Sequence, residues 1–180
     1  RGNVEAASDL LDRVLPGARG QFSLRIADDA CASHAPARAG AAANTGCFVL
    51  SDAPDGRVSI VATSANELTY GIGVYLRDKC GMTIGWPRGG ASSVFIPTPW
   101  PKIGSAPLVS RRNVPWSYFM NVCTHSYSLV WYSWADWEQF IGEPASLCLH
   151  LSTHLLVSLT CPPPPQQTGW RWPASTTSSR

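Results

Sequence analysis

The chain has 180 residues, of which 44% are hydrophobic and 14% charged, and its formal net charge is +2. This length allows one ordinary domain, or one small domain with a piece of another. A net charge this small argues against binding to nucleic acid or to an anionic membrane surface, so we expect neither partner. The apolar-leaning stretch 147–159 is shorter than the roughly 20 residues that cross a bilayer.

The first half of the chain predicts a helix, three strands, a second helix and one or two more strands. Apolar residues recur at helical spacing over residues 4–15, and Pro16-Gly17 predicts the end of that helix. Residues 21–27 alternate apolar and polar side chains, which indicates a half-buried strand. Two β-rich runs, 47–50 and 57–62, flank a turn-forming cluster, which favours a hairpin.

A second helix is predicted to begin after Ser64. Glu67 follows at the spacing of a capping box, in which the serine hydroxyl accepts the Glu67 amide and the carboxylate returns to Ser64. Gly81 stands where a left-handed residue closes a helix. Short strands are expected at 82–86 and 94–96. Since helices bury their apolar face against a sheet, we predict an α/β (α+β) fold with the helices on one side of the sheet.

Proline spacing predicts the division of the chain. Four prolines and a glycine indicate a linker over residues 97–111. We therefore predict a small N-terminal α/β domain over residues 1–96 and the start of a second domain over 112–143. That second part is expected to hold a strand over 114–122 and a helix over 131–141.

Six irregularly spaced cysteines, without a C-x-x-C pair, argue against a zinc site. Residues 28–45 lack periodicity and are predicted to form a long surface loop. Cys31 and Cys47 bracket most of this loop. They either form a disulfide in an oxidising compartment or remain two unrelated thiols, and the sequence leaves both interpretations open.

Aromatic side chains are dense over residues 118–140, which hold eight of them among short polar groups. Sugar sites need this combination, because the apolar face of a pyranose stacks on a ring while its hydroxyls require placed hydrogen-bond partners. Core packing also uses aromatic rings, and periodicity alone favours packing.

Two motifs favour the sugar interpretation. Residues 112–124, RNVPWSYFMNVCT, resemble the entry into the catalytic barrel of the α-N-acetylglucosaminidases, glycosidases that remove terminal α-linked N-acetylglucosamine from heparan sulfate. Residues 71–81, GIGVYLRDKCG, followed by Trp86, resemble the small N-terminal domain of the same family. The resemblance covers about residues 1–141.

The resemblance implies that this chain is the N-terminal part of such a glycoside hydrolase, ending in the first βα unit of a truncated (β/α)8 barrel. Active sites of these barrels lie at the carboxyl ends of the strands. The resemblance implies substrate-binding roles for Asn121 and Cys123, with stacking by Tyr127 and Trp131, while His125 departs from the family's usual glutamine. It further implies a glycan partner with terminal N-acetylglucosamine, no cofactor or metal, and a lysosomal, vacuolar or secreted location.

The catalytic pair of this family is expected outside the matching stretch. Such enzymes use two carboxylates, as general acid and as nucleophile, and the family draws both from strands beyond residue 143. Asp136 and Glu138 diverge on a predicted helix, and Glu67 is predicted as a cap. We therefore predict no catalytic residue and no hydrolase activity in the chain alone. The alternative is a non-catalytic α/β module that binds carbohydrate or protein.

Residues 144–180 depart from the family and are predicted to form an unrelated, disordered tail. They contain six prolines, no acidic residue and no lysine. A translated intron, a frameshifted exon or a splice variant explains such a tail, and so does a genuine Ser/Thr/Pro-rich segment. Pro144 also disfavours helical geometry at Glu143. No signal peptide follows Arg1, which indicates a removed signal or an internal fragment.

Overall fold

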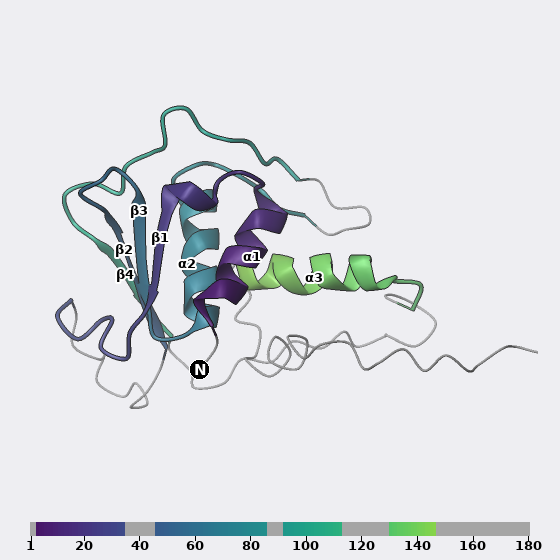
Figure 1. Cartoon of the computed structure of the whole chain (residues 1–180), viewed down its shortest axis with the longest axis horizontal. Helices are drawn as coiled ribbons and strands as arrows, with labels where there is room; N and C mark the ends of the chain where they lie inside the picture. Colours follow the sequence, from purple (N-terminus) through teal and green to yellow (C-terminus); the bar gives the residue numbers. More distant parts are fainter. Residues whose placement is uncertain (1–2, 35–45, 86–91, 113–129, 147–180) are drawn as a thin grey trace, which may run out of the picture.

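The computed structural model describes residues 3–34, 46–85, 92–112 and 130–146 (Figure 1). A helix, three strands and a second helix follow one another as the sequence predicts, and one more strand and a third helix come after them. In chain order the elements are α1 Val4–Val14, the 3-10 helix η1 Arg19–Gln21, β1 Phe22–Ile26, β2 Cys47–Asp52, β3 Val58–Ala62, α2 Ala65–Asp78, β4 Leu108–Arg111 and α3 Trp134–Ser146.

The four strands form one mixed sheet in the order β1-β3-β2-β4. The central strand β3 runs parallel to β1 and antiparallel to β2, with Leu24 and Leu50 on either side of Ile60. Strand β2 also pairs antiparallel with β4. The turn between β2 and β3 contains Gly56 at φ 84°, a left-handed conformation that glycine adopts without steric penalty. The predicted hairpin is therefore confirmed.

Helices α1 and α2 cover one face of this sheet, and α3 packs against α2 (Figure 1). Successive residues of a strand face opposite sides, so Val58, Ile60 and Ala62 of β3 enter the core with at most 2% of their surface exposed. Helix α2 comes close to the sheet at Gly71, where a Cβ would lie 2.9 Å from Ile60 Cγ2. The predicted α/β fold, with helices on one side of a sheet, is confirmed.

Residues after β1 cover part of the opposite face of the sheet. Ala30 and Cys31 pack there with Cys47 and Val49 of β2, and all four side chains are buried. This second, smaller cluster explains why β2 is buried on both faces over its first four residues. The predicted surface loop is described as far as His34, and residues 35–45 lie outside the described ranges.

The two short strands predicted at 82–86 and 94–96 are not found in the described residues. One isolated antiparallel bridge joins Thr83 to Ser93 instead. Met82 and Ile84 are buried, and Met82 belongs to the core beneath the helices. The apolar alternation that suggested a strand over 82–86 therefore reflects side-chain packing. The edge of the sheet beside β2 is formed by β4 instead.

The proline-rich segment is not a free linker. Trp100 packs edge-to-face on Phe22, at 5.6 Å between ring centroids, and the Tyr75 hydroxyl donates to the carbonyl of Pro101 at 2.7 Å. Residues 108–111, the last four of the predicted linker, form β4 of the sheet. Prolines remove ladder hydrogen bonds, but they do not prevent side chains from anchoring a segment.

Helix α3 begins three residues later than predicted and extends to Ser146. The helix therefore runs five residues beyond the predicted end at 141 and includes Glu143, where Pro144 was expected to disfavour it. Proline lacks one backbone donor and disfavours, without forbidding, helical geometry in the preceding residue. In the last turn of a helix this costs few intrahelical bonds. The strand predicted over 114–122 lies outside the described residues, as does the tail beyond Ser146.

Candidate functional site

Trp131 is the one predicted sugar-contacting residue that the structure describes. Its side chain is 82% exposed in the turn that precedes α3, and Trp134, in the first turn of that helix, is 58% exposed. An exposed indole offers a flat apolar surface beside a polar N–H. Asn121, Cys123 and Tyr127 lie outside the described residues, so their predicted roles stay predictions.

Other aromatic rings of the same run serve packing. Tyr132, Trp137 and Phe140 meet edge-to-face, with ring centroids 5.8 to 6.1 Å apart. Phe140 is 4% exposed, and α3 packs against α2. In its described part, the aromatic run is therefore divided between a packed cluster, of which Phe140 is buried and Tyr132 and Trp137 are half-buried, and two solvent-facing tryptophans.

The start of α3 is fixed by a reciprocal cap that the sequence analysis missed. The Asp136 carboxylate accepts the Ser133 N–H at 2.8 Å and the Ser133 hydroxyl at 2.7 Å, while the Asp136 N–H points back to Ser133 Oγ at 3.3 Å. This Ser-x-x-Asp spacing is the signal that also marks Ser64 and Glu67. The cap sets the direction of the helix beside both exposed tryptophans.

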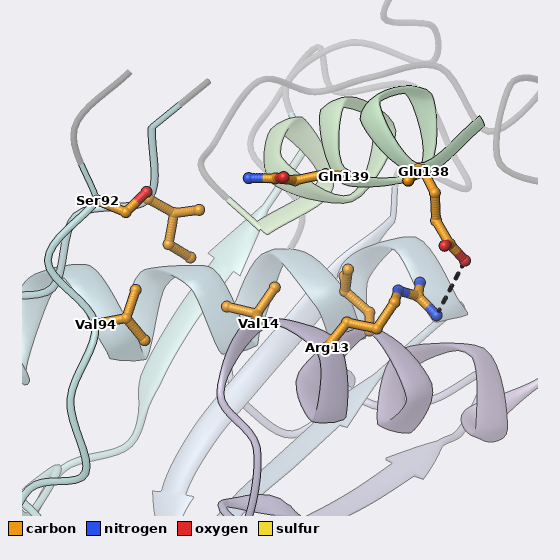
Figure 2. A pocket seen from close by; sticks show the side chains of 9 residues that line it. Arg13, Val14, Ser92, Val94, Glu138 and Gln139 are labelled. Atoms are coloured by element: carbon orange, nitrogen blue, oxygen red, sulfur yellow. Dashed lines mark ion pairs between the residues drawn. The ribbon is translucent and has the colours of Figure 1, made fainter. Parts of the chain in front are cut away.

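A pocket of about 380 Å³ lies between α1, α3 and the chain around Ile84 and Val94 (Figure 2). Figure 2 shows Arg13 of α1 and Glu138 of α3 facing each other at one end, and these side chains form an ion pair at 3.7 Å. Sequence reasoning missed this pocket because its walls come from segments far apart in the chain. Its described lining residues are Leu10, Arg13, Val14, Ile84, Ser92, Val94, Ala135, Glu138 and Gln139.

Glu67 does not close the predicted capping box. Its carboxylate forms an ion pair with Arg112 and accepts the Ser64 hydroxyl, and the cap of α2 has no side-chain hydrogen bond to the backbone. The side chains of Glu67 and Arg112 are only 8% and 10% exposed. The Arg112 N–H also donates to the Gly46 carbonyl at 2.8 Å. This buried pair therefore ties the start of α2 to the residue at which the second predicted domain begins.

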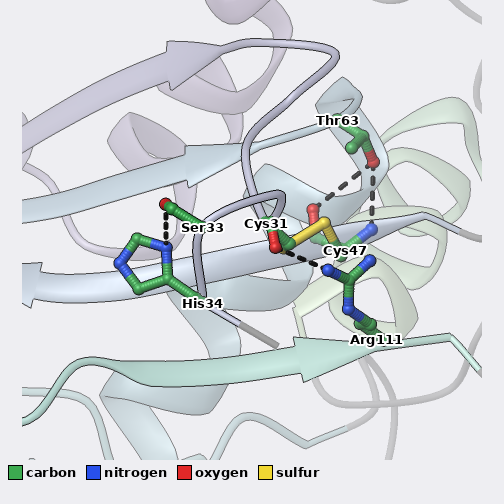
Figure 3. The surroundings of a disulfide bond; sticks show 6 residues. All are labelled: Cys31, Ser33, His34, Cys47, Thr63 and Arg111. Carbon is green, nitrogen blue, oxygen red and sulfur yellow. Dashed lines mark hydrogen bonds between the residues drawn. A yellow bond between two sulfur atoms is a disulfide. The ribbon is translucent and has the colours of Figure 1, made fainter. Parts of the chain in front are cut away.

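A disulfide joins Cys31 to Cys47 next to this ion pair, with Cα atoms 6.5 Å apart (Figure 3). The Cys47 N–H donates to Thr63 Oγ1 at 3.0 Å, and Arg111 donates to the Cys31 carbonyl at 2.5 Å. Of the two interpretations that the sequence left open, the structure has the disulfide. Covalent and polar contacts thus converge on the end of the sheet where β4 ends.

The shifted pKa values described next belong to groups that stabilise the fold. Backbone N–H groups of Ile103 and Gly104, at 3.0 and 3.1 Å, lower the pKa of Asp52. Burial raises the pKa of the Tyr75 hydroxyl and that of the Cys80 thiol. A buried thiol with a raised pKa is a poor nucleophile. These groups therefore do not form an acid–base pair of the kind that cleaves glycosidic bonds.

The carboxylates considered as catalytic substitutes are engaged elsewhere. Asp136 caps α3, Glu138 pairs with Arg13, and Glu67 pairs with Arg112. Over the described ranges, no group of three or more His, Cys, Asp or Glu side chains is placed to hold a metal ion. Nor does any helix there have the length and apolar character that spanning a membrane requires.

Fold and sequence together define the class of this chain as an N-terminal α/β domain of a glycoside hydrolase. A sequence model of the alpha-N-acetylglucosaminidase N-terminal domain matches residues 5–102, more than half of the chain. The chain belongs to this family, and the resemblance seen in the sequence is confirmed.

Similar proteins extend well beyond the length of this chain. Human alpha-N-acetylglucosaminidase is 35% identical over 85 residues, which are 47% of this chain and 11% of the human protein. A family 89 glycoside hydrolase from Clostridium perfringens, solved with its substrate GlcNAc-alpha-1,4-galactose, superposes with a TM-score of 0.66 at 24% identity. The superposition covers 79% of this chain and 15% of that enzyme, and the same enzyme family with PUGNAc gives 0.64 at 25% identity.

Proposed function

We propose that this chain is the N-terminal portion of an α-N-acetylglucosaminidase-like glycoside hydrolase. The complete enzyme would remove terminal α-linked N-acetylglucosamine from glycans such as heparan sulfate. The observation that carries this proposal is the family match over residues 5–102, which includes both helices that cover the sheet. The fold shared with the Clostridium perfringens enzymes supports it.

Within that enzyme, the sheet and the helices that cover it form a supporting domain, which positions the start of the catalytic barrel. The Glu67–Arg112 pair lies at the end of β4, immediately before the segment that resembles the first barrel strand. We keep residues 112–143 as the beginning of that barrel. A parallel strand needs its neighbours for its ladder hydrogen bonds and for burial of both faces, so the chain by itself is proposed to be inactive.

Four residues are proposed to contact the terminal sugar in the complete enzyme: Asn121, Cys123, Tyr127 and Trp131. The 82% exposure of Trp131 supports its part, because a stacking ring must present its face to the ligand. A lysosomal, vacuolar or secreted location is part of the same proposal. The Cys31–Cys47 disulfide supports that location, since such bonds persist in oxidising compartments.

The test is a hydrolysis assay of the purified 180-residue chain with an aryl α-N-acetylglucosaminide. We expect no release of the phenol above the rate of a heat-denatured sample, while complete human alpha-N-acetylglucosaminidase serves as the positive control. Turnover that stays proportional to the amount of chain through successive purification steps would overturn the proposal of inactivity.

The exposed tryptophans also favour a second candidate function, that of a non-catalytic carbohydrate-binding module. Trp131 and Trp134 present two indoles to solvent within four residues of chain. Saturable binding of N-acetylglucosamine that disappears in Trp131→Ala would support this candidate. The same titration without saturation would exclude it for this sugar.

A further inference from the structure

We propose that the pocket between α1 and α3 is a binding site for a neutral pyranose sugar. This site differs from the predicted one, since none of Asn121, Cys123, Tyr127 or Trp131 is among its described lining residues. The inference does not depend on the proposed hydrolase function. Its support is the chemistry of the pocket wall and the size of the pocket.

One part of the wall is aliphatic. Leu10 and Val14 come from α1, and Ile84 and Val94 come from the chain that passes beneath α3. Leu10 and Ile84 are 4% and 8% exposed, so their side chains are held in place by the packing around them. Such a surface accepts the C–H face of a pyranose, because burying apolar surface of both partners is favourable.

The polar part of the wall carries both donors and acceptors. Arg13 and Glu138 stand 3.7 Å apart, beyond direct hydrogen-bond distance, and are 46% and 42% exposed. A ligand hydroxyl can therefore donate to the carboxylate and accept from the guanidinium at the same time. Ser92 Oγ already accepts the Gly85 N–H at 2.8 Å, which leaves the serine proton to donate. The Gln139 side chain adds an amide to this wall.

The opposite charges in the pocket wall favour a neutral ligand. Arg13 and Glu138 are the two charged residues among those that line the described pocket, and their charges are opposite. An anionic sugar would gain from Arg13 and lose to Glu138, whereas hydroxyl groups satisfy both. We therefore expect N-acetylglucosamine to bind in preference to glucuronate.

The size of the pocket fits a short ligand. A volume of about 380 Å³ is near the lower end of small-molecule pockets, about 300–1,000 Å³. This suits one sugar ring or a short unit rather than a long chain. Trp134 precedes Glu138 by four residues on α3, and residues at this spacing lie on the same helix face. Its indole is 58% exposed and lies about one helical turn from Glu138, but it is not among the described residues that line the pocket.

The experiment is a titration of the whole 180-residue chain with N-acetylglucosamine, followed by ligand-observed NMR and calorimetry. We expect saturable binding with a dissociation constant of about 1 mM, a typical value for a ligand of this size. Glucuronate at equal concentration should bind at least about fivefold more weakly. Absence of saturation with N-acetylglucosamine up to about 50-fold above that constant overturns the proposal.

Two substitutions locate the site. Ala135→Trp, at an exposed position on α3, should fill the pocket and weaken binding at least about tenfold, a loss typical of occluding a small site. Glu138→Gln keeps the shape of the wall and removes the charged acceptor, so a smaller loss is expected. The matched control is Glu5→Gln on α1, which changes an exposed ion pair with Arg19 of η1, away from the pocket lining, and should leave binding unchanged.

A third variant separates this pocket from the exposed tryptophan turn. Trp131→Ala should retain binding if the pocket is the site. Loss of binding in Trp131→Ala, with full binding in Ala135→Trp, would overturn the proposal. Unfolding midpoints of all variants are measured alongside. If Ala135→Trp fails to fold, unchanged affinity in Glu138→Gln for both N-acetylglucosamine and glucuronate overturns the proposal.

Discussion

Helices α2 and α3 both begin with a serine followed three residues later by an acidic residue, yet the two carboxylates bind different partners. At α3, Asp136 and Ser133 form a reciprocal cap on the protein surface. At α2, Ser64 donates to Glu67, and Glu67 turns to Arg112, 45 residues further along the chain. The spacing correctly marks the start of both helices, but the tertiary partner decides what each acid does.

Burial explains the difference. A carboxylate that loses water requires strong compensation, and a cation with a hydroxyl supplies it. Glu67 is 6% exposed as a residue, and the described structure gives its carboxylate both kinds of partner. Asp136 lies in the solvent-accessible first turn of α3, where short local hydrogen bonds suffice.

The largest expected effect comes from removing the buried acid. Glu67→Ala leaves the Arg112 guanidinium buried without its counter-charge, and we expect a loss of about 3–5 kcal/mol in the free energy of unfolding. Urea denaturation followed by tryptophan fluorescence measures it. Glu5→Ala, which breaks an exposed pair with Arg19, is the control and should have little effect. Equal, small losses in both variants would contradict the structural role of the buried pair.

A second substitution probes how tightly the buried pair is enclosed. A Cβ on Gly46 would clash with the Glu67 carboxylate, so Gly46→Ala should cost about 1–3 kcal/mol by overpacking. In the double variant with Glu67→Ala, the clash disappears and the two losses should not add. Strict additivity in the same urea experiment would show that Gly46 does not contact the carboxylate.

The smallest effect is expected at the exposed cap. Ser133→Ala removes the oxygen that receives the Asp136 N–H, and loss of such a cap costs about 1 kcal/mol. Ser133→Thr keeps the oxygen and should recover most of that loss. Helical circular dichroism and the urea midpoint report the change. A threonine variant as unstable as the alanine variant would argue that Ser133 packs rather than caps.

Local patterns were sufficient for most of the first domain. The helical period of α1, the alternation of β1 and the turn around Gly56 each depend on neighbours in sequence, and each was predicted. Strand β4 was missed because Leu108–Arg111 follows a proline-rich segment and is defined by its pairing with β2. That pairing joins residues about 60 positions apart, which no local pattern reports.

The candidate site was predictable only in part. The dense aromatic run and the family resemblance pointed to Asn121, Cys123, Tyr127 and Trp131, and the exposure of Trp131 became visible only in the structure. The pocket could not be predicted from the sequence, because Arg13 of α1 and Glu138 of α3 come together only when α3 packs against α2. In the same way, nothing in the sequence around Arg112 predicts its ion pair with Glu67.

The disulfide has a practical consequence for engineering this chain. Cys31 and Cys47 hold the two ends of the intervening stretch 6.5 Å apart at the Cα atoms, whatever its length. Lengthening a closed loop adds only a logarithmic entropy cost, about 0.6 kcal/mol for each doubling. An affinity tag or a reporter peptide placed between residues 35 and 45 should therefore leave the sheet and its helices intact, provided that the chain is produced where the disulfide can form.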